Sequence, residues 1–159
     1  MIFEKAEDFI EKIEKNARLL GVDFGCKNIG LAVSDRGLTI AVPKTIIPRQ
    51  KNSLTIQNLR RIIAENGVSG IVFGLPLNSE GKETAFCKNI RNFVNEMCKA
   101  VDIPIFFYDE FLTSDNAKSM VIDELGGNFR TAKKNLDKIS AALLLGDFLE
   151  KIKLRTQKI

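Results

Sequence analysis

Histidine is absent from this 159-residue sequence. Without it the chain cannot form a Ser-His-Asp triad, a Cys-His pair, a histidine general base or an ordinary histidine-containing zinc site. Any catalytic chemistry would therefore have to use carboxylates, lysines, hydroxyl groups or a metal ion that prefers oxygen ligands.

Cysteine is scarce as well. Cys26, Cys87 and Cys98 form no C-x-x-C motif, and their odd number argues against a disulfide framework, so a cytoplasmic protein is expected. Cys87 and Cys98 recur on one face of an expected helix, which predicts burial as small apolar side chains. Long apolar runs are also missing, and the first residues mix Glu and Lys with apolar side chains. We therefore expect neither a signal peptide nor a membrane partner.

The composition that is present suits one folded domain. Hydrophobic residues make up 45% of the chain, which is enough for a core at this length. The formal net charge of +4 is a mild basic bias that favours polyanionic partners without identifying one. We expect a domain over residues 18–150, a helical extension over 1–17 and a basic tail over 151–159. Both a monomer and a homodimer are compatible with this sequence.

The stretch from Arg18 to Asp35, RLLGVDFGCKNIGLAVSD, has the clearest local pattern. It predicts a short apolar strand that delivers Asp23 to its end, a turn from Gly25 to Gly30, and a second apolar strand. A carboxylate at the exit of a buried strand puts a fixed negative charge at the edge of a sheet. A metal ion or a phosphate-bearing ligand can bind at such a place.

The remaining chain changes from short turns to an alternation of strands and helices. Pro43 confines a third strand, over 38–47, to an edge or an irregular pairing. Further strands are predicted over 68–73 and 103–108, and helices over 1–16, from Ser53 to Gly67, over 83–101, from Thr113 or Ser114 to Leu125, and from about Asp137. We expect an α/β fold with a mixed five-stranded sheet, three strands antiparallel and two parallel, and helices on both faces.

Acids stand at the ends of three predicted elements. Asp23 and Glu110 follow strands, and Asp137 opens the last helix. Each has an ordinary structural explanation, as a turn former, an exposed strand-end residue and a helix N-cap respectively. Together, in a chain without histidine, they are the raw material of a carboxylate cluster that binds a divalent metal ion. Such a cluster repels itself unless cations neutralise it.

Four ordered motifs resemble those of the YqgF/RuvX family: LLGVDFGCKNIGLAVSD, GIVFGLPLNSEG, FYDEFLTSDNA and LDKISAALLLGDFL. The resemblance spans about Arg18 to Leu149 and implies a ribonuclease H-like fold. It also implies a nuclease, because family members are described as acting in maturation of the 5′ end of pre-16S ribosomal RNA. Older descriptions have them resolve Holliday junctions.

Position by position, the resemblance implies that Asp23, Glu110 and Asp137 are the catalytic metal ligands, with Asp109 as the reserve candidate. The sequence departs from the family at Cys26, where threonine is common, and at Phe111, where arginine often follows the Asp-Glu pair. The second departure removes a guanidinium from beside the acids.

Substrate-binding candidates come from the first turn, from the loop at 74–81, and from the segment 126–136. The last of these pairs two glycines with like charges, so it is expected to be a mobile loop whose cations hold a phosphate backbone, with a plain solvated loop as the alternative. The candidates are Lys27, Asn78, Arg130, Lys133 and Lys134.

The implied reaction is metal-assisted phosphodiester hydrolysis, in which two Mg²⁺ or Mn²⁺ ions about 4 Å apart activate a water and stabilise the leaving oxygen. The expected partner is nucleic acid, either pre-rRNA or branched DNA. One alternative is a non-catalytic RNA-binding module. The other, an actin-like or sugar-kinase-like ATPase, needs a second similar domain, for which 159 residues leave no room.

Overall fold

A mixed six-stranded sheet forms the centre of the computed structural model. The structure describes residues 1–109 and 129–157, and the side chains of residues 129–138 lie outside that description. The strands lie in the order β1-β6-β5-β2-β3-β4. Their bounds are β1 (Ile2–Phe3), β2 (Arg18–Phe24), β3 (Asn28–Ser34), β4 (Ala41–Pro48), β5 (Val68–Leu75) and β6 (Ile105–Asp109).

The pairing confirms the predicted mixed sheet. β2, β3 and β4 form an antiparallel meander, whereas β5 is parallel to β2 and β6 is parallel to β5. The sixth strand was not predicted: β1 pairs in parallel with β6, with Ile2 opposite Ile105 and Phe3 opposite Phe106. A strand of two residues has no periodicity of its own, and its hydrogen bonds to a strand distant in sequence decide its conformation.

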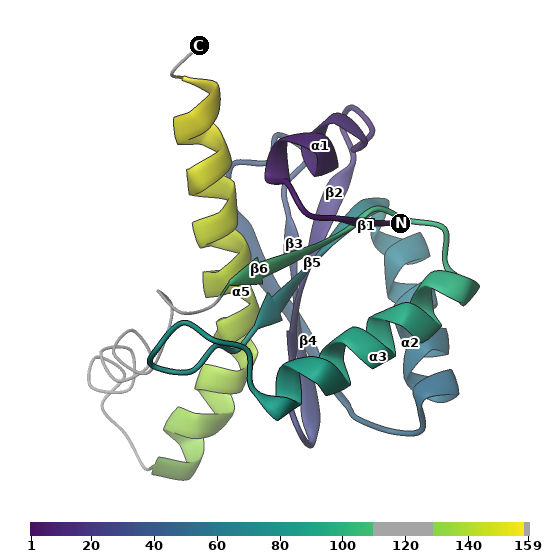
Figure 1. The fold of residues 1–159 in the computed structure, drawn as a ribbon, viewed down its shortest axis with the longest axis vertical. Coiled ribbons are helices and arrows are strands. Elements are labelled where there is room, and N and C mark those ends of the chain that lie inside the picture. Colours follow the sequence, from purple (N-terminus) through teal and green to yellow (C-terminus); the bar gives the residue numbers. More distant parts are fainter. Residues whose placement is uncertain (110–128, 158–159) are drawn as a thin grey trace.

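Helices cover both faces of the sheet, as predicted (Figure 1). α2 and α3 pack on one face, and α1 and α5 pack on the other. Their bounds are α1 (Ala6–Glu11), α2 (Asn52–Asn66), α3 (Ala85–Ala100) and α5 (Phe129–Thr156). In the described part of the chain, no helix combines the length and the apolar composition needed to cross a bilayer.

Each face of the sheet has its own apolar core, because neighbouring residues of a strand point to opposite faces. Under α2 and α3, the rings of Phe73 and Phe107 lie 6.3 Å apart. Under α1 and α5, Phe9 stacks on Phe106 at 5.7 Å and meets the edge of Phe148 at 6.0 Å. β2 and β5 are thus buried on both faces, which explains their nearly continuous apolar sequences.

The cysteines confirm the expected burial on the α3 side. Cys87 is fully buried, and Cys98 is partly buried against the same core. Cys26 is exposed, and all three thiols are free.

The N-terminal helix is shorter than predicted. It was expected over 1–16, but Ile2 and Phe3 belong to β1, and α1 ends at Glu11. The apolar spacing beyond that point still serves packing, because the side chain of Ile13 fills the space above Gly70 on β5. The apolar periodicity over residues 1–16 therefore marks mainly side chains that are buried or partly buried, but only residues 6–11 of this segment form a helix.

The start of α2 also differs from the prediction. Lys51 is at the N-cap and makes no side-chain hydrogen bond to the first turn, so Ser53 is not the cap. Leu54 was expected on the buried face and is 48% exposed, whereas Leu59 is fully buried. The end is correct, because α2 stops at Asn66.

The start of α5 corrects the predicted loop and the predicted start of the last helix. Residues 129–136 are helical, so they do not form a loop, and Asp137 does not open the helix. Residues 129–136 include arginine, alanine, lysine and leucine. These residue types have high helix propensity, so the segment is helical even though it shows no apolar stripe. α5 continues through Thr156, so residues 151–156 of the expected tail are helical. The predicted helix from Thr113 or Ser114 to Leu125 lies outside the described residues.

β4 is an edge strand, as Pro43 predicts. Its ladder with β3 shifts register where Leu31 pairs with Thr45 and Ala32 pairs with Pro43, so Lys44 is the extra residue of a bulge. The irregularity lets the sheet accommodate a residue that has no N–H to donate.

α5 crosses β2 at Gly21 with almost no space between them. A Cβ atom added at Gly21 would lie 2.8 Å from the Cβ of Leu145 and 3.0 Å from the carbonyl oxygen of Ala141. Only glycine allows helix backbone to come this close to the strand. The contact therefore sets the position of α5 along β2.

Replacing Gly21 by alanine should destabilise the fold by about 1–3 kcal/mol, because the new methyl group overpacks against helix backbone that cannot rotate away. Gly146, in α5, is the matched control, since an added Cβ there meets no described atom within 4 Å beyond its own helix backbone. Gly146→Ala should raise the free energy of unfolding by up to about 1 kcal/mol. Urea denaturation measures both, and equal stability of Gly21→Ala and the parent would contradict the tight packing.

Candidate active site

Asp23 lies near the carboxyl end of β2, in the middle of the sheet between β5 and β3. It is half-buried and is in register with Gly30, so no side chain opposes it on β3. Because it is two residues beyond Gly21 on the same strand, it lies on the face that α5 covers. The position agrees with the predicted strand end.

The turn after Asp23 is tight. The N–H of Gly25 donates to the carbonyl oxygen of Asn28 at 2.9 Å, and a Cβ at Gly25 would lie 2.5 Å from that oxygen. The turn therefore requires glycine at position 25. Cys26 and Lys27 form its tip and are exposed, so Lys27 lies on the solvent side of the strand end that carries Asp23.

α5 brings the backbone of Asp137 toward the same end of β2. Asp137 is one helical turn before Ala141, whose carbonyl oxygen contacts Gly21. Figure 1 shows the N-terminal part of α5 and the β2–β3 turn at the same end of the molecule. One turn of helix spans about 5.4 Å, close to the rise of two strand residues from Gly21 to Asp23. The backbone of Asp137 therefore lies toward the end of the sheet that carries Asp23.

β6 brings Asp109 to this edge of the sheet, in register with Leu75. Tyr108 packs in the core under α5, so Asp109, the next residue, lies on the opposite face. Asp109 thus does not share a face with Asp23. Glu110 and Phe111 lie outside the described residues.

The predicted trio of acids stays a prediction. Among the residues whose side chains the structure describes, no three Cys, Asp or Glu side chains come close enough together to hold a metal ion. Glu110 and the side chain of Asp137 are not among them. Arg130, Lys133 and Lys134 have helical backbone in α5, and their side chains are equally outside the description.

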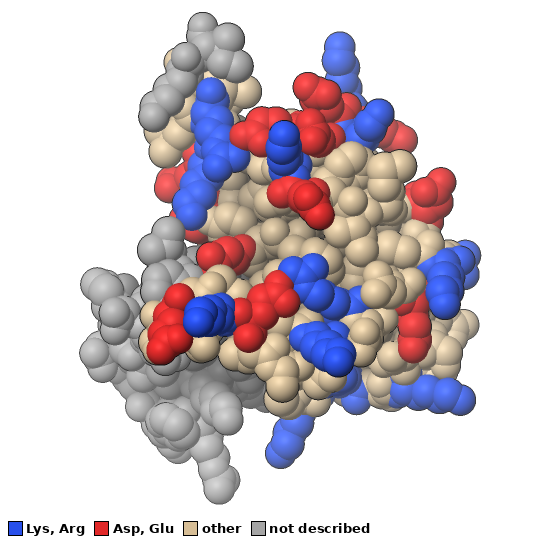
Figure 2. Space-filling model, in the orientation of Figure 1, with Lys and Arg blue, Asp and Glu red and all other residues tan. Residues whose placement is uncertain are grey.

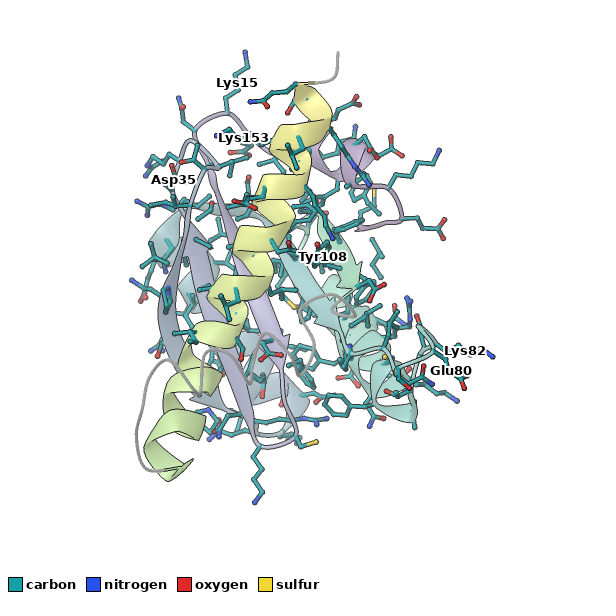
Figure 3. The ribbon with its side chains drawn as sticks, turned by 90° about the vertical axis from the view of Figure 1, so that its left-hand side faces the viewer. Lys15, Asp35, Glu80, Lys82, Tyr108 and Lys153 are labelled. Atoms are coloured by element: carbon teal, nitrogen blue, oxygen red, sulfur yellow. The ribbon has the colours of Figure 1, made fainter. Side chains whose placement is uncertain are left out.

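Tyr108 links β6 to α5. Its hydroxyl donates a hydrogen bond to Oδ2 of Asp147, and Nζ of Lys151 lies 3.5 Å from that oxygen and 5.0 Å from the centre of the tyrosine ring. Figure 3 shows Tyr108 beside α5. Burial and the carboxylate acceptor raise the pKa of the Tyr108 hydroxyl far above its usual range. These contacts tie the strand that leads to Glu110 to the helix that carries Asp137.

The loop after β5 is closed by Asn78. Its Oδ1 accepts hydrogen bonds from the backbone N–H groups of Glu80 and Lys82, both at 3.0 Å. Figure 3 shows Glu80 and Lys82 at the right-hand margin of the view, to one side of α5. The side-chain oxygen of Asn78 thus stabilises the turn. The predicted contact with a substrate would therefore use the amide N–H groups of Asn78 as donors.

Arg49 lies at this end of the sheet and was missed by sequence reasoning. It follows β4, its backbone N–H donates to the carbonyl oxygen of Lys27 at 2.8 Å, and its guanidinium carbon lies 4.6 Å from the ring centre of Phe24. The register of the β3–β4 hairpin is the feature that could have predicted the position of Arg49. Because Asn28 pairs with Pro48, residue 49 must come beside the turn that follows Asp23.

The comparison with protein families decides the relationship. Residues 17–151 match the family model RuvX, which is described as Holliday junction resolvase. The chain belongs to the RuvX family. Relatives from Ruegeria sp. (strain TM1040) and Anaplasma marginale (strain St. Maries) are named "Putative pre-16S rRNA nuclease". They are 35% and 36% identical over 153 residues, which cover 96% of this chain and 97% of each relative. The predicted family is confirmed.

Two solved structures share the fold of this RuvX protein. T. thermophilus RuvC in complex with a Holliday junction substrate has a TM-score of 0.53 at 11% identity, covering 86% of this chain and 96% of that chain. The Fowlpox virus resolvase in complex with Holliday junction DNA has a TM-score of 0.51 at 15% identity, covering 85% and 98%. At these identities the likeness shows the fold alone, and it agrees with the predicted class.

Tyr108 is the only tyrosine of this RuvX protein, so its ionisation can be followed without interference. We expect no tyrosinate absorbance in the folded protein near pH 10, the ordinary value, and a normal titration after unfolding in urea. Because the folded pKa is raised, the stabilisation is complete below about pH 10 and is lost as the pH rises further. A native midpoint near 10, read at 295 nm, would contradict the buried hydrogen bond.

Proposed function

We propose that this RuvX protein is a metal-dependent nuclease that hydrolyses phosphodiester bonds and processes the 5′ end of pre-16S rRNA. The observation that carries the proposal is the close approach of α5 to β2 at Gly21. Asp137 is one helical turn before Ala141 on α5, and Asp23 is two residues beyond Gly21 on β2, which supports a site shared by the two at the carboxyl end of the central strands. Ligand sites of open α/β sheets occur at this end of the strands.

The proposed donor set fits a hard divalent cation. Asp23, Glu110 and Asp137 offer only carboxylate oxygens, the ligands that Mg²⁺ and Mn²⁺ prefer, and the chain has no histidine to attract zinc instead. When bound, two such ions would supply an activated water and would stabilise the leaving oxygen.

The roles of the chain's own residues follow from the elements that carry them. Asp23 stands on a strand buried on both faces, which fixes its backbone position. The contact at Gly21 holds α5, the helix that carries Asp137, against β2, and the hydrogen bond from Tyr108 to Asp147 holds the strand that precedes Glu110. The acids act as ligands that orient the reaction, and none is the nucleophile.

Ribosomal RNA is the preferred substrate because the relatives that cover this chain almost completely are named for pre-16S rRNA. Branched DNA is the second candidate, supported by the description of the family model. A non-catalytic RNA-binding module is the third, and it differs from both in that it needs no metal ion.

Asp23→Asn is the decisive variant. We expect hydrolysis to fall by roughly 100-fold or more, since loss of a metal ligand should cost at least as much as loss of its supporting contacts. The free energy of unfolding without metal should stay equal or rise slightly, because one of three mutually repelling charges is removed. Cleavage of precursor rRNA, single-stranded RNA, single-stranded DNA and a four-way junction, with Mg²⁺, Mn²⁺ or EDTA, measures activity. Urea denaturation in EDTA measures stability.

Asp102→Asn is the matched control, because Asp102 is exposed and precedes β6 at the opposite end of the strands. It should cleave as the parent does. Equal rates for Asp23→Asn and the parent at saturating Mn²⁺ would reject the metal nuclease and leave the RNA-binding module. Cleavage of the junction without any cleavage of RNA would replace the rRNA substrate by branched DNA.

A further inference from the structure

Arg49 is held firmly at the carboxyl edge of the sheet. Its guanidinium carbon lies 4.6 Å from the ring centre of Phe24, and its backbone N–H donates to the carbonyl oxygen of Lys27 at 2.8 Å. The side chain is half-buried, whereas Lys27 is exposed. A guanidinium held over an aromatic ring still has N–H groups that can donate hydrogen bonds to another group.

The charge of Arg49 has no carboxylate to neutralise it within the described part of the chain. Two arginines differ in this respect: Nε of Arg91 donates to both carboxylate oxygens of Glu83 at 3.1 and 3.2 Å, and Arg155 pairs with Glu7 at 2.6 Å. Arg91 also lies over an aromatic ring, with its guanidinium carbon 4.8 Å from the ring centre of Phe107. Arg49 and Arg91 thus share an aromatic support, and only Arg91 has its charge satisfied by a described acid.

The position of Arg49 relates it directly to Asp23. Phe24 follows Asp23 on β2, so the two side chains lie on opposite faces of the same strand end. Lys27 belongs to the turn that connects this end to β3, and Arg49 is hydrogen-bonded to that turn. A polyanionic strand that places one phosphate at Asp23 and continues over the edge would therefore meet both cations.

We propose that Arg49, with Lys27, forms a binding subsite for a backbone phosphate of the nucleic acid, next to the phosphate that reacts. The planar fork of Arg49 suits bidentate contact with phosphate oxygens, and Lys27 adds a flexible point charge. Figure 2 shows cations and acids intermixed over the face in view, so attraction by a uniformly basic surface is not the source of binding on that face. The subsite positions the substrate and reads no base.

This inference rests on the proposed function, because it assumes that nucleic acid crosses the site. Its test measures binding of a fluorescein-labelled single-stranded RNA in EDTA over a series of KCl concentrations. Loss of one phosphate contact should weaken binding and reduce the slope of log K against log[KCl] by about 0.7. We expect this change for Arg49→Gln, and a smaller loss of affinity with a parent-like slope for Arg49→Lys, which keeps the charge.

Arg91→Gln is the matched control, because it also removes a guanidinium from an aromatic ring but leaves no phosphate contact missing. The slope of log K against log[KCl] for Arg91→Gln should equal that of the parent. Thermal unfolding of both variants measures how much stability is lost with the guanidinium–ring contact. A parent-like slope for Arg49→Gln, or an equal reduction for Arg91→Gln, would overturn the subsite. If the parent cleaves RNA with Mn²⁺ in the same series, either of these two slopes rejects the phosphate subsite and leaves the proposed nuclease function standing. If the parent neither binds nor cleaves any substrate, both the subsite and the proposed function are rejected.

Discussion

The contact between α5 and β2 at Gly21 is the constraint on which the geometry of the site depends. Since glycine presents no Cβ, the carbonyl oxygen of Ala141 and the side chain of Leu145 rest directly on strand backbone. Packed interiors have little free volume, so the helix cannot slide along the sheet without opening a gap or a clash. Two regions that are far apart in the sequence are thereby held at one end of the molecule.

A second tether acts on the same helix. The hydrogen bond from Tyr108 to Asp147 and the cation of Lys151 connect α5 to β6, one strand further from β2 than β5. Because the acceptor is charged and the donor is buried, this bond is stronger than an ordinary neutral one. The two tethers lie on different strands, so together they restrict rotation of α5 over the sheet as well as sliding.

Most of the sheet was predictable from local patterns. β5 and β6 appear as apolar runs, β2 and β3 are marked by the glycines of their turn, and Pro43 identifies β4 as an edge. β1 was not predictable, because two residues have no periodicity and only pairing with β6 makes them a strand. The beginning of α5 was missed because helix propensity, without an apolar stripe, extends it to Phe129.

The candidate site was predictable in part. The strand-and-turn pattern and the motif resemblance predicted Asp23 and the acids that follow the apolar run of β6 as candidates, but neither could say on which face of the sheet each acid lies. The alternation along β6, fixed by Tyr108 under α5, separates Asp109 from Asp23. Arg49 depends on the register of β3 with β4 and on a ring that it covers, and both are long-range features that no local spacing encodes.

The two margins of the sheet have a consequence for how copies of the protein behave toward one another. On one side the edge strand is β1, which has only two residues, and Met1 before it also bonds to the β6 segment: its carbonyl oxygen accepts from the N–H of Ile105 at 2.8 Å, and its amino group donates to the carbonyl oxygen of Ile103 at 3.3 Å. On the other side Pro43 and Pro48 remove donors from β4, and the bulge at Lys44 bends it. Among the described residues neither margin offers a long, flat row of free backbone groups, so these two edges resist growth into intermolecular β-structure even at high concentration.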